Sequence, residues 1–150
     1  MPTDTVAATA KWGDIGDWDV SGVKDFSYAF SRCRNVGGSY VGNAFACVSG
    51  NPKVAEMNSD LSKWNVAKVR TLPYAFYSAY KFAGVGLDSW DISKVTDMSN
   101  TFTSATSLTT CNKRKIADAW KSSAVFVATS YDTDWAADKC TVCLRMIEGC

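Results

Sequence analysis

The sequence predicts an α+β repeat solenoid, in which short strands and a helix of one or two turns form each coil and a helical, cysteine-rich cap closes the C-terminal end. The first observation is a thirteen-residue segment that is repeated with small changes from Trp18, Trp64 and Trp90. The second is that apolar residues keep the same spacing from the tryptophan in every copy. A unit this short cannot bury its own aromatic side chains, whereas stacked copies shelter one another.

Six apolar columns run through the three copies. They lie three residues before the tryptophan, at the tryptophan, and two, five, eight and twelve residues after it. Their members are Ile15, Leu61 and Leu87; Trp18, Trp64 and Trp90; Val20, Val66 and Ile92; Val23, Val69 and Val95; Phe26, Leu72 and Met98; and Phe30, Phe76 and Phe102. Columns in register favour burial as ladders between stacked coils over an exposed aromatic platform for carbohydrate.

Each copy predicts the same order of local structures. An extended segment around the tryptophan leads into a turn, a second extended piece at the valine, and a helix of one or two turns that begins eight residues after the tryptophan. The turns are expected at residues 21–22, 67–68 and 93–94, and the helices at residues 26–33, 72–79 and 98–105. Asp25, Thr71 and Asp97 precede the helices and suit N-cap positions, and Pro73 suits a first helical turn.

One domain with distinct ends is expected from a chain of 150 residues. Its parts are an N-terminal arm or capping strand at 1–11, the solenoid at 12–110 with an insertion near 37–56, and the cap at 111–150. The stretch at 37–56 is rich in Gly, Ser and Asn, and it fits a loop insertion and a degenerate fourth coil equally well. In the cap, Ile116 and Trp120 share one face of an expected amphipathic helix.

The six cysteines form an even set in which disulfides are favoured over free thiols and over a zinc site. They are Cys33, Cys47, Cys111, Cys140, Cys143 and Cys150. A bridge between Cys33 and Cys47 would close the base of the insertion. A zinc site would need Cys111 and Cys150 to complete the pair Cys140 and Cys143 at poor spacing, so no metal or other cofactor is expected.

Composition excludes several classes of function. A formal net charge of +1 gives no field for nucleic acid, and no apolar run approaches the length of a membrane helix. The absence of histidine removes the usual general base and the histidine-assisted nucleophile. Aspartates near the tryptophans, such as Asp88 and Asp91, suit turns better than catalysis, so a carboxylate-dependent hydrolase is only a second alternative. The N-terminus has no intact secretory signal, so the chain is either not secreted or a processed form.

The segments WDVSGVKDFSYAF and WDISKVTDMSNTF resemble the BspA-like leucine-rich repeat family, a 26-residue repeat of bacterial surface proteins. The resemblance covers about residues 15–110, and the middle copy departs from it at Ala67, Thr71 and Pro73. It implies leucine-rich-repeat-like right-handed coils and a cell-surface or secreted interaction protein. The additional cysteines then imply an extracytoplasmic place, either a cell surface or an organelle lumen in a eukaryotic alga.

The function expected from these observations is non-catalytic binding of another protein, as a structural or accessory subunit of a multi-subunit complex. Tyr28 and Tyr74 stand ten residues after their tryptophans and are candidates for a partner-facing surface, as are Tyr40 and Phe45 in the insertion. A position at the edge of the core fits these tyrosines as well. An adhesin-like module that binds glycan at a cell surface is the first alternative.

Overall fold

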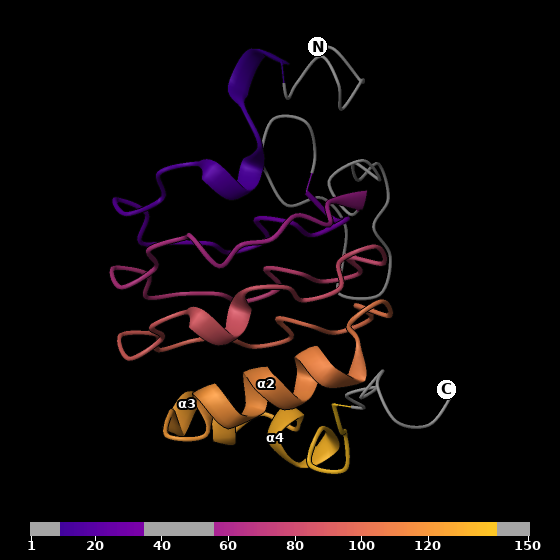
Figure 1. The fold of residues 1–150 in the computed structure, drawn as a ribbon. Helices are drawn as coiled ribbons and strands as arrows, with labels where there is room; N and C mark the ends of the chain where they lie inside the picture. The colour runs from indigo at the N-terminus through magenta and orange to yellow at the C-terminus, as the bar shows by residue number, and fades with distance from the viewer. Residues whose placement is uncertain (1–9, 35–55, 141–150) are drawn as a thin grey trace, which may run out of the picture.

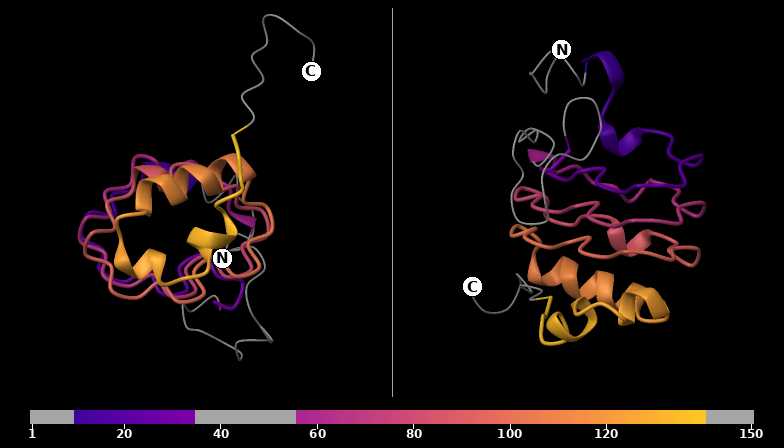
Figure 2. Two further views of the ribbon diagram at one scale, coloured as in Figure 1. Left: turned by 90° about the horizontal axis from the view of Figure 1, so that it is seen from below. Right: turned by 180° about the vertical axis from the view of Figure 1, so that it is seen from behind.

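The computed structural model describes residues 10–34 and 56–140, and in this part of the chain three layers lie one above another, followed by helices (Figure 1). Layer 1 comprises residues 15–34, layer 2 residues 61–82 and layer 3 residues 87–108. Viewed along the stack, the outlines of the layers superimpose (Figure 2). The regular elements are the 3-10 helices η1 (Ile15–Asp17) and η3 (Leu87–Ser89) and the α-helices α2 (Thr110–Trp120), α3 (Ala124–Val127) and α4 (Tyr131–Asp134).

A ladder of backbone hydrogen bonds joins the layers, and most of its amides donate from one layer to the next, while Arg70 and Thr96 donate back to Lys24 and Arg70. From layer 1, the amides of Phe26, Tyr28, Phe30 and Arg32 donate to the carbonyl oxygens of Thr71, Pro73, Ala75 and Tyr77 at 3.0, 3.1, 2.7 and 3.1 Å. From layer 2, the amides of Leu72, Tyr74, Phe76 and Ser78 donate to Asp97, Ser99, Thr101 and Thr103 at 2.7, 2.9, 2.9 and 2.9 Å. The register is parallel, with bridges from Asp25 to Thr71 and from Thr71 to Asp97.

The ladder explains why the segments eight residues past each tryptophan are turns and not the expected helices. Only every second amide crosses to the next layer, and the amides between them bond three residues back, as Ala29 does to Phe26 and Ala75 to Leu72. A helix would instead use consecutive amides to bond four residues back. Tyr28 and Tyr74 also have φ angles of 58° and 55°, a left-handed conformation that ends any helical run.

The residues expected as N-caps stabilise these turns in another way. The side chains of Asp25 and Asp97 accept hydrogen bonds from the amides two residues on, at 2.7 and 2.9 Å. Thr71 uses its hydroxyl to donate to Asp25 of the layer above, at 2.8 Å. The N-cap prediction is therefore wrong, since no helix follows these residues, although the carboxylates of Asp25 and Asp97 do accept hydrogen bonds from nearby amides.

The aromatic columns form most of the core. Trp64 and Trp90 stack with ring centroids 6.1 Å apart and planes 5° from parallel, and Phe76 stacks on Phe102 at 5.6 Å. Both tryptophans are no more than 5% exposed. The column prediction fails at Trp18, which is 45% exposed because no layer precedes it among the described residues.

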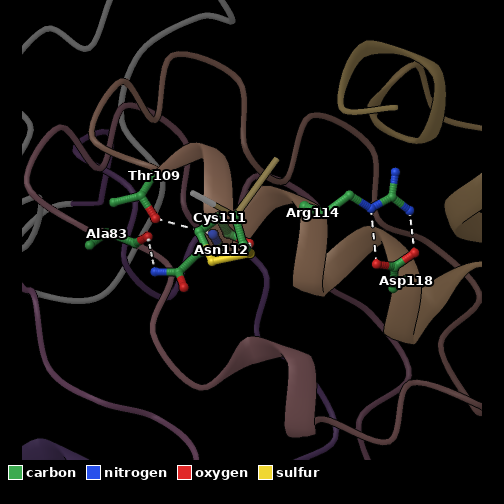
Figure 3. Close-up of a disulfide and its surroundings, with 7 residues drawn as sticks. Ala83, Thr109, Cys111, Asn112, Arg114 and Asp118 are labelled. Atoms are coloured by element: carbon green, nitrogen blue, oxygen red, sulfur yellow. Dashed lines mark hydrogen bonds and ion pairs between the residues drawn. A yellow bond between two sulfur atoms is a disulfide. The ribbon is translucent and has the colours of Figure 1, made fainter. Parts of the chain in front are cut away.

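The expected helix of the cap is present as α2, which lies over η3 and buries Ile116, Ala117 and Trp120. Its first turn is capped by the Thr109 side chain, which accepts from the amide of Asn112 at 3.1 Å. A disulfide from Cys111 to Cys140 joins the start of α2 to the end of the described cap (Figure 3). Within the basic run 113–115, Arg114 forms an ion pair with Asp118 one turn further on (Figure 3).

Candidate interaction surface

Tyr28 and Tyr74 are brought together by the stacking of layers 1 and 2. Their rings stack with centroids 5.0 Å apart and planes 12° from parallel, and both side chains are half-buried. The amide of Tyr28 donates to Pro73 at 3.1 Å and that of Tyr74 to Ser99 at 2.9 Å, so the ladder fixes the backbone at both positions. The pair is therefore held in a defined arrangement by main-chain bonds and not only by contact between the rings.

The aromatic surface extends along layer 2 but not into layer 3. The ring of Tyr77 lies 5.5 Å from that of Tyr74 at 57°, and the Tyr80 hydroxyl donates to Glu56 at 3.3 Å. In layer 3 the position equivalent to Tyr28 and Tyr74 is Asn100, which is exposed and also left-handed, with φ 54°. We call the group formed by Tyr28, Tyr74 and Tyr77 the tyrosine face.

The other predicted binding residues, Tyr40 and Phe45, lie outside the described residues, as do Cys47, Cys143 and Cys150. For the cysteines that are described, the disulfide prediction is confirmed: Cys111 is bonded to Cys140, and Cys33 is disulfide-bonded as well. The bond between Cys111 and Cys140 also removes two of the four thiolates that a zinc site in the cap would need.

The aspartates that directly follow the tryptophans accept hydrogen bonds within their own turns. The carboxylates of Asp19 and Asp91 accept from the amides of Ser21 and Ser93 at 2.9 and 3.0 Å, and Asn65 accepts from Ala67 in the same place in layer 2. Hydrogen bonds from Ser21 and Ser93 lower the pKa of Asp19 and Asp91 below the ordinary value. Asn at the middle position keeps the same hydrogen bond, which indicates that an acceptor and not a charge is required there.

The N-terminal end of the stack carries an aromatic patch that the sequence reasoning missed. Trp12 is 63% exposed and Trp18 45%, and with Asp19 they line a shallow groove of about 440 Å³. The Trp18 indole N–H donates to the Trp12 carbonyl at 2.9 Å, and the Lys11 ammonium lies 4.8 Å from the Trp12 ring centroid. The exposure of Trp18 could have been predicted from the sequence, because Trp18 belongs to the first of the three copies and no earlier copy is present to cover its ring.

Two other features, a cluster of metal ligands and a membrane-spanning helix, are absent from the described residues. Within 10–34 and 56–140, no three His, Cys, Asp or Glu residues gather as metal ligands. In the same part of the chain, no helix has the length and apolar character needed to cross a bilayer.

Three copies of one segment, stacked in parallel register, place the chain in the class of tandem-repeat proteins. The sequence profile of DUF285, described as a Mycoplasma protein of unknown function, matches residues 6–115 and 43–136. These two overlapping matches together span most of the chain, and the protein belongs to the DUF285 family. This membership supports the expected relationship to the BspA-like surface-protein repeats. Comparison with curated proteins and with solved structures gave no match.

Proposed function

We propose that this protein is a non-catalytic module that binds another protein, as an accessory or linker subunit of a larger assembly. The observation that carries the proposal is the stack of Tyr28 on Tyr74. Tyrosine is enriched at protein interfaces because its ring buries a large area with few torsions to immobilise. Here the ladder already fixes the backbone of both residues, so little further ordering is needed when a partner binds.

The scaffold in this proposal is a repeat solenoid of the leucine-rich-repeat type. Support comes from the parallel ladder between layers and from the buried columns of Trp64 with Trp90 and of Phe76 with Phe102. In repeat proteins each unit is stabilised mainly by its neighbours, and the surface that the stack creates is the usual binding surface. The tyrosine face is such a surface, because it exists only where layers 1 and 2 meet.

The proposed compartment is extracytoplasmic, at a cell surface or in an organelle lumen. A disulfide between Cys111 and Cys140 fits an oxidising environment, since cytosolic thiols are kept reduced. The relationship to surface-protein repeats points the same way.

Glycan binding at a cell surface is the second candidate, because two nearly parallel tyrosine rings also offer an apolar platform for a sugar. Both candidates use the same residues, so only the identity of the bound molecule separates them.

The test uses the full chain as bait in an extract of the organism that produces it, followed by titration of the purified partner. Tyr28→Ala with Tyr74→Ala should weaken binding of that partner by tenfold or more, as expected for central aromatic residues of an interface (on the order of 2 kcal/mol). Val127→Ala is the matched control, because Val127 is exposed on the cap at 49%. Binding of a glycan, with no protein partner, would support the second candidate, and unchanged protein binding by the tyrosine variant would refute the proposed surface.

A further inference from the structure

The ladder between the layers has a direction, and this leaves the first layer with a row of acceptors at its outer edge. In layer 2, the carbonyls of Thr71 and Pro73 face layer 1 and accept its amides. The equivalent carbonyls of layer 1 belong to Asp25 and Ser27, and among the described residues no hydrogen bond reaches either oxygen. Next to them, the amide of Lys24 is equivalent to that of Arg70, which donates to the Lys24 carbonyl at 2.8 Å.

The remaining half of this edge is already occupied by Arg34. Its guanidinium donates to the Ala29 carbonyl at 3.2 Å and its backbone amide to the Ser31 carbonyl at 3.1 Å. The equivalent carbonyls of layer 2, on Ala75 and Tyr77, are the ones that accept from layer 1. Among the described residues, the unpaired part of the edge is therefore short and consists of one donor at Lys24, followed by two acceptors two residues apart. We call residues 24–27 the open edge.

An apolar surface lies at the same end of the stack. In layers 2 and 3, each tryptophan is covered by the layer above it and is 5% or 4% exposed, whereas Trp18 keeps 45% of its surface open. Trp18 and Trp12 line the groove described above. Polar main-chain groups in a fixed spacing and an exposed indole, both at this end of the stack, are the two features that a bound strand-like peptide uses, one for register and the other for affinity.

We propose that the open edge and Trp18 bind an extended segment of a partner polypeptide, which adds in parallel as the layer preceding layer 1. In this arrangement the segment donates two amides, two residues apart, to Asp25 and Ser27, and it accepts from Lys24. An apolar side chain of the segment covers Trp18. The geometry is the one by which layer 1 pairs with layer 2, through the amides of Phe26 and Tyr28.

The direction of the ladder argues against a second copy of this chain as the occupant. Two first layers placed face to face would each offer two acceptors and only one donor, the Lys24 amide, so most of the main-chain acceptors would have no donor. The equivalent donor edge of a second copy is on layer 3, at Met98 and Asn100, and the cap is packed beside it. There Ala124 and Val125 line one groove together with Met98, and the Phe102 amide donates to the Tyr131 hydroxyl at 3.0 Å. A different polypeptide is therefore the occupant that fits.

This inference rests on the proposed function, since it names the chemistry of one protein partner and the place where it binds. It adds a site at the end of the stack that is separate from the tyrosine face. The two can fail independently, because the test below reports on Trp18 and residues 24–27, while the test of the tyrosine face reports on Tyr28 and Tyr74.

The probe is a synthetic peptide with the sequence of residues 12–32, because this segment makes the proposed pairing with layer 2. Two methylated peptides accompany it. The first carries N-methyl groups at Phe26 and Tyr28, which removes both cross-layer donors. The matched control carries them at Val20 and Gly22, whose amides make no hydrogen bond within the described residues. Each peptide is titrated into the isotope-labelled full chain, and amide chemical shifts are followed.

We expect the unmodified and control peptides to shift resonances of residues 12–27 with equal affinity, and the peptide methylated at Phe26 and Tyr28 to bind at least about tenfold more weakly, since two hydrogen bonds are lost. Trp18→Ser should weaken binding of the unmodified peptide, whereas Val127→Ser should not. Equal binding of both methylated peptides, or no binding at millimolar peptide, would overturn the proposal. So would self-association that shifts the same residues, or peptide binding that appears only after deletion of residues 1–9, since each identifies another occupant.

Discussion

The indole N–H of Trp90 donates to the backbone carbonyl of Leu61 at 3.1 Å, across 29 residues of sequence. Trp64 makes the same bond to Ile15 at 2.9 Å. In both cases the acceptor stands three residues before the tryptophan of the layer above. Each tryptophan therefore contributes twice to the contact between layers, through a buried ring and through a polar bond that fixes its register.

Removal of these rings should show different costs along the column. Trp90→Ala is expected to lower the free energy of unfolding by about 3–5 kcal/mol, because it leaves a cavity and removes one of the two hydrogen bonds to the Leu61 carbonyl, which also accepts from the Trp64 amide. Trp18→Ala should cost about 1 kcal/mol or less, because that ring is 45% exposed. Urea titration of both variants measures the difference, and equal costs would contradict burial by the preceding layer.

Gly86 is required by a close approach between layers 2 and 3. Its φ is 88°, and a Cβ atom there would lie 2.2 Å from the Ser62 amide nitrogen, so Gly86→Ala combines a steric clash with backbone strain. We expect a loss of more than about 2 kcal/mol in the free energy of unfolding. Gly13→Ala is the control, since Gly13 has φ 75° with nothing within 4 Å of the Cβ position, and it should show the strain alone, about 1 kcal/mol. Similar losses for both variants would mean that the layers are not in this contact.

Acid should weaken the turns that contain Asp91. Hydrogen bonds from Ser93 lower the pKa of Asp91 in the folded protein, so this group stabilises the fold above about pH 3.9, its ordinary value, and the contribution is lost as the pH falls through the folded pKa. Asp91→Asn keeps the acceptor, as Asn65 does in layer 2, and should show a smaller loss of stability between pH 4 and pH 2. Asn65→Asp should show the reverse. The measurement is the free energy of unfolding across this range, and parallel pH profiles would refute the assignment.

The disulfide between Cys111 and Cys140 should stabilise the cap mainly by restricting the unfolded chain. For a sequence separation of 29 residues, the chain-entropy estimate is about 3–4 kcal/mol. Cys111→Ser with Cys140→Ser should lower the midpoint of thermal unfolding accordingly, while reduction of this double variant should produce a smaller further change than reduction of the wild type. Alkylation of both cysteines in denatured, unreduced protein would contradict the bond.

The sequence alone determined which residues form the core. Columns of tryptophan, valine and phenylalanine at fixed spacing require a neighbouring copy for burial, and Trp64, Trp90 and Phe76 are buried as that spacing predicts. The turns at 21–22, 67–68 and 93–94 could also be predicted, because an Asp or Asn precedes each one by two residues and accepts its hydrogen bond. The helix of the cap followed from the spacing of Ile116 and Trp120.

The tertiary structure decided how the backbone between the columns is bonded. From the sequence, residues 26–33 had the spacing and the N-cap of a short helix, but their amides are divided between the neighbouring layer and their own turn. Local propensity contains no information on this division, because the competing acceptors are supplied by a segment about 45 residues away. The stacking of Tyr28 on Tyr74 and the open edge of layer 1 are consequences of the same ladder. They appear only when the layers are in contact. The ladder fixes both the register of the side chains and the direction in which the carbonyls of Asp25 and Ser27 in layer 1 point.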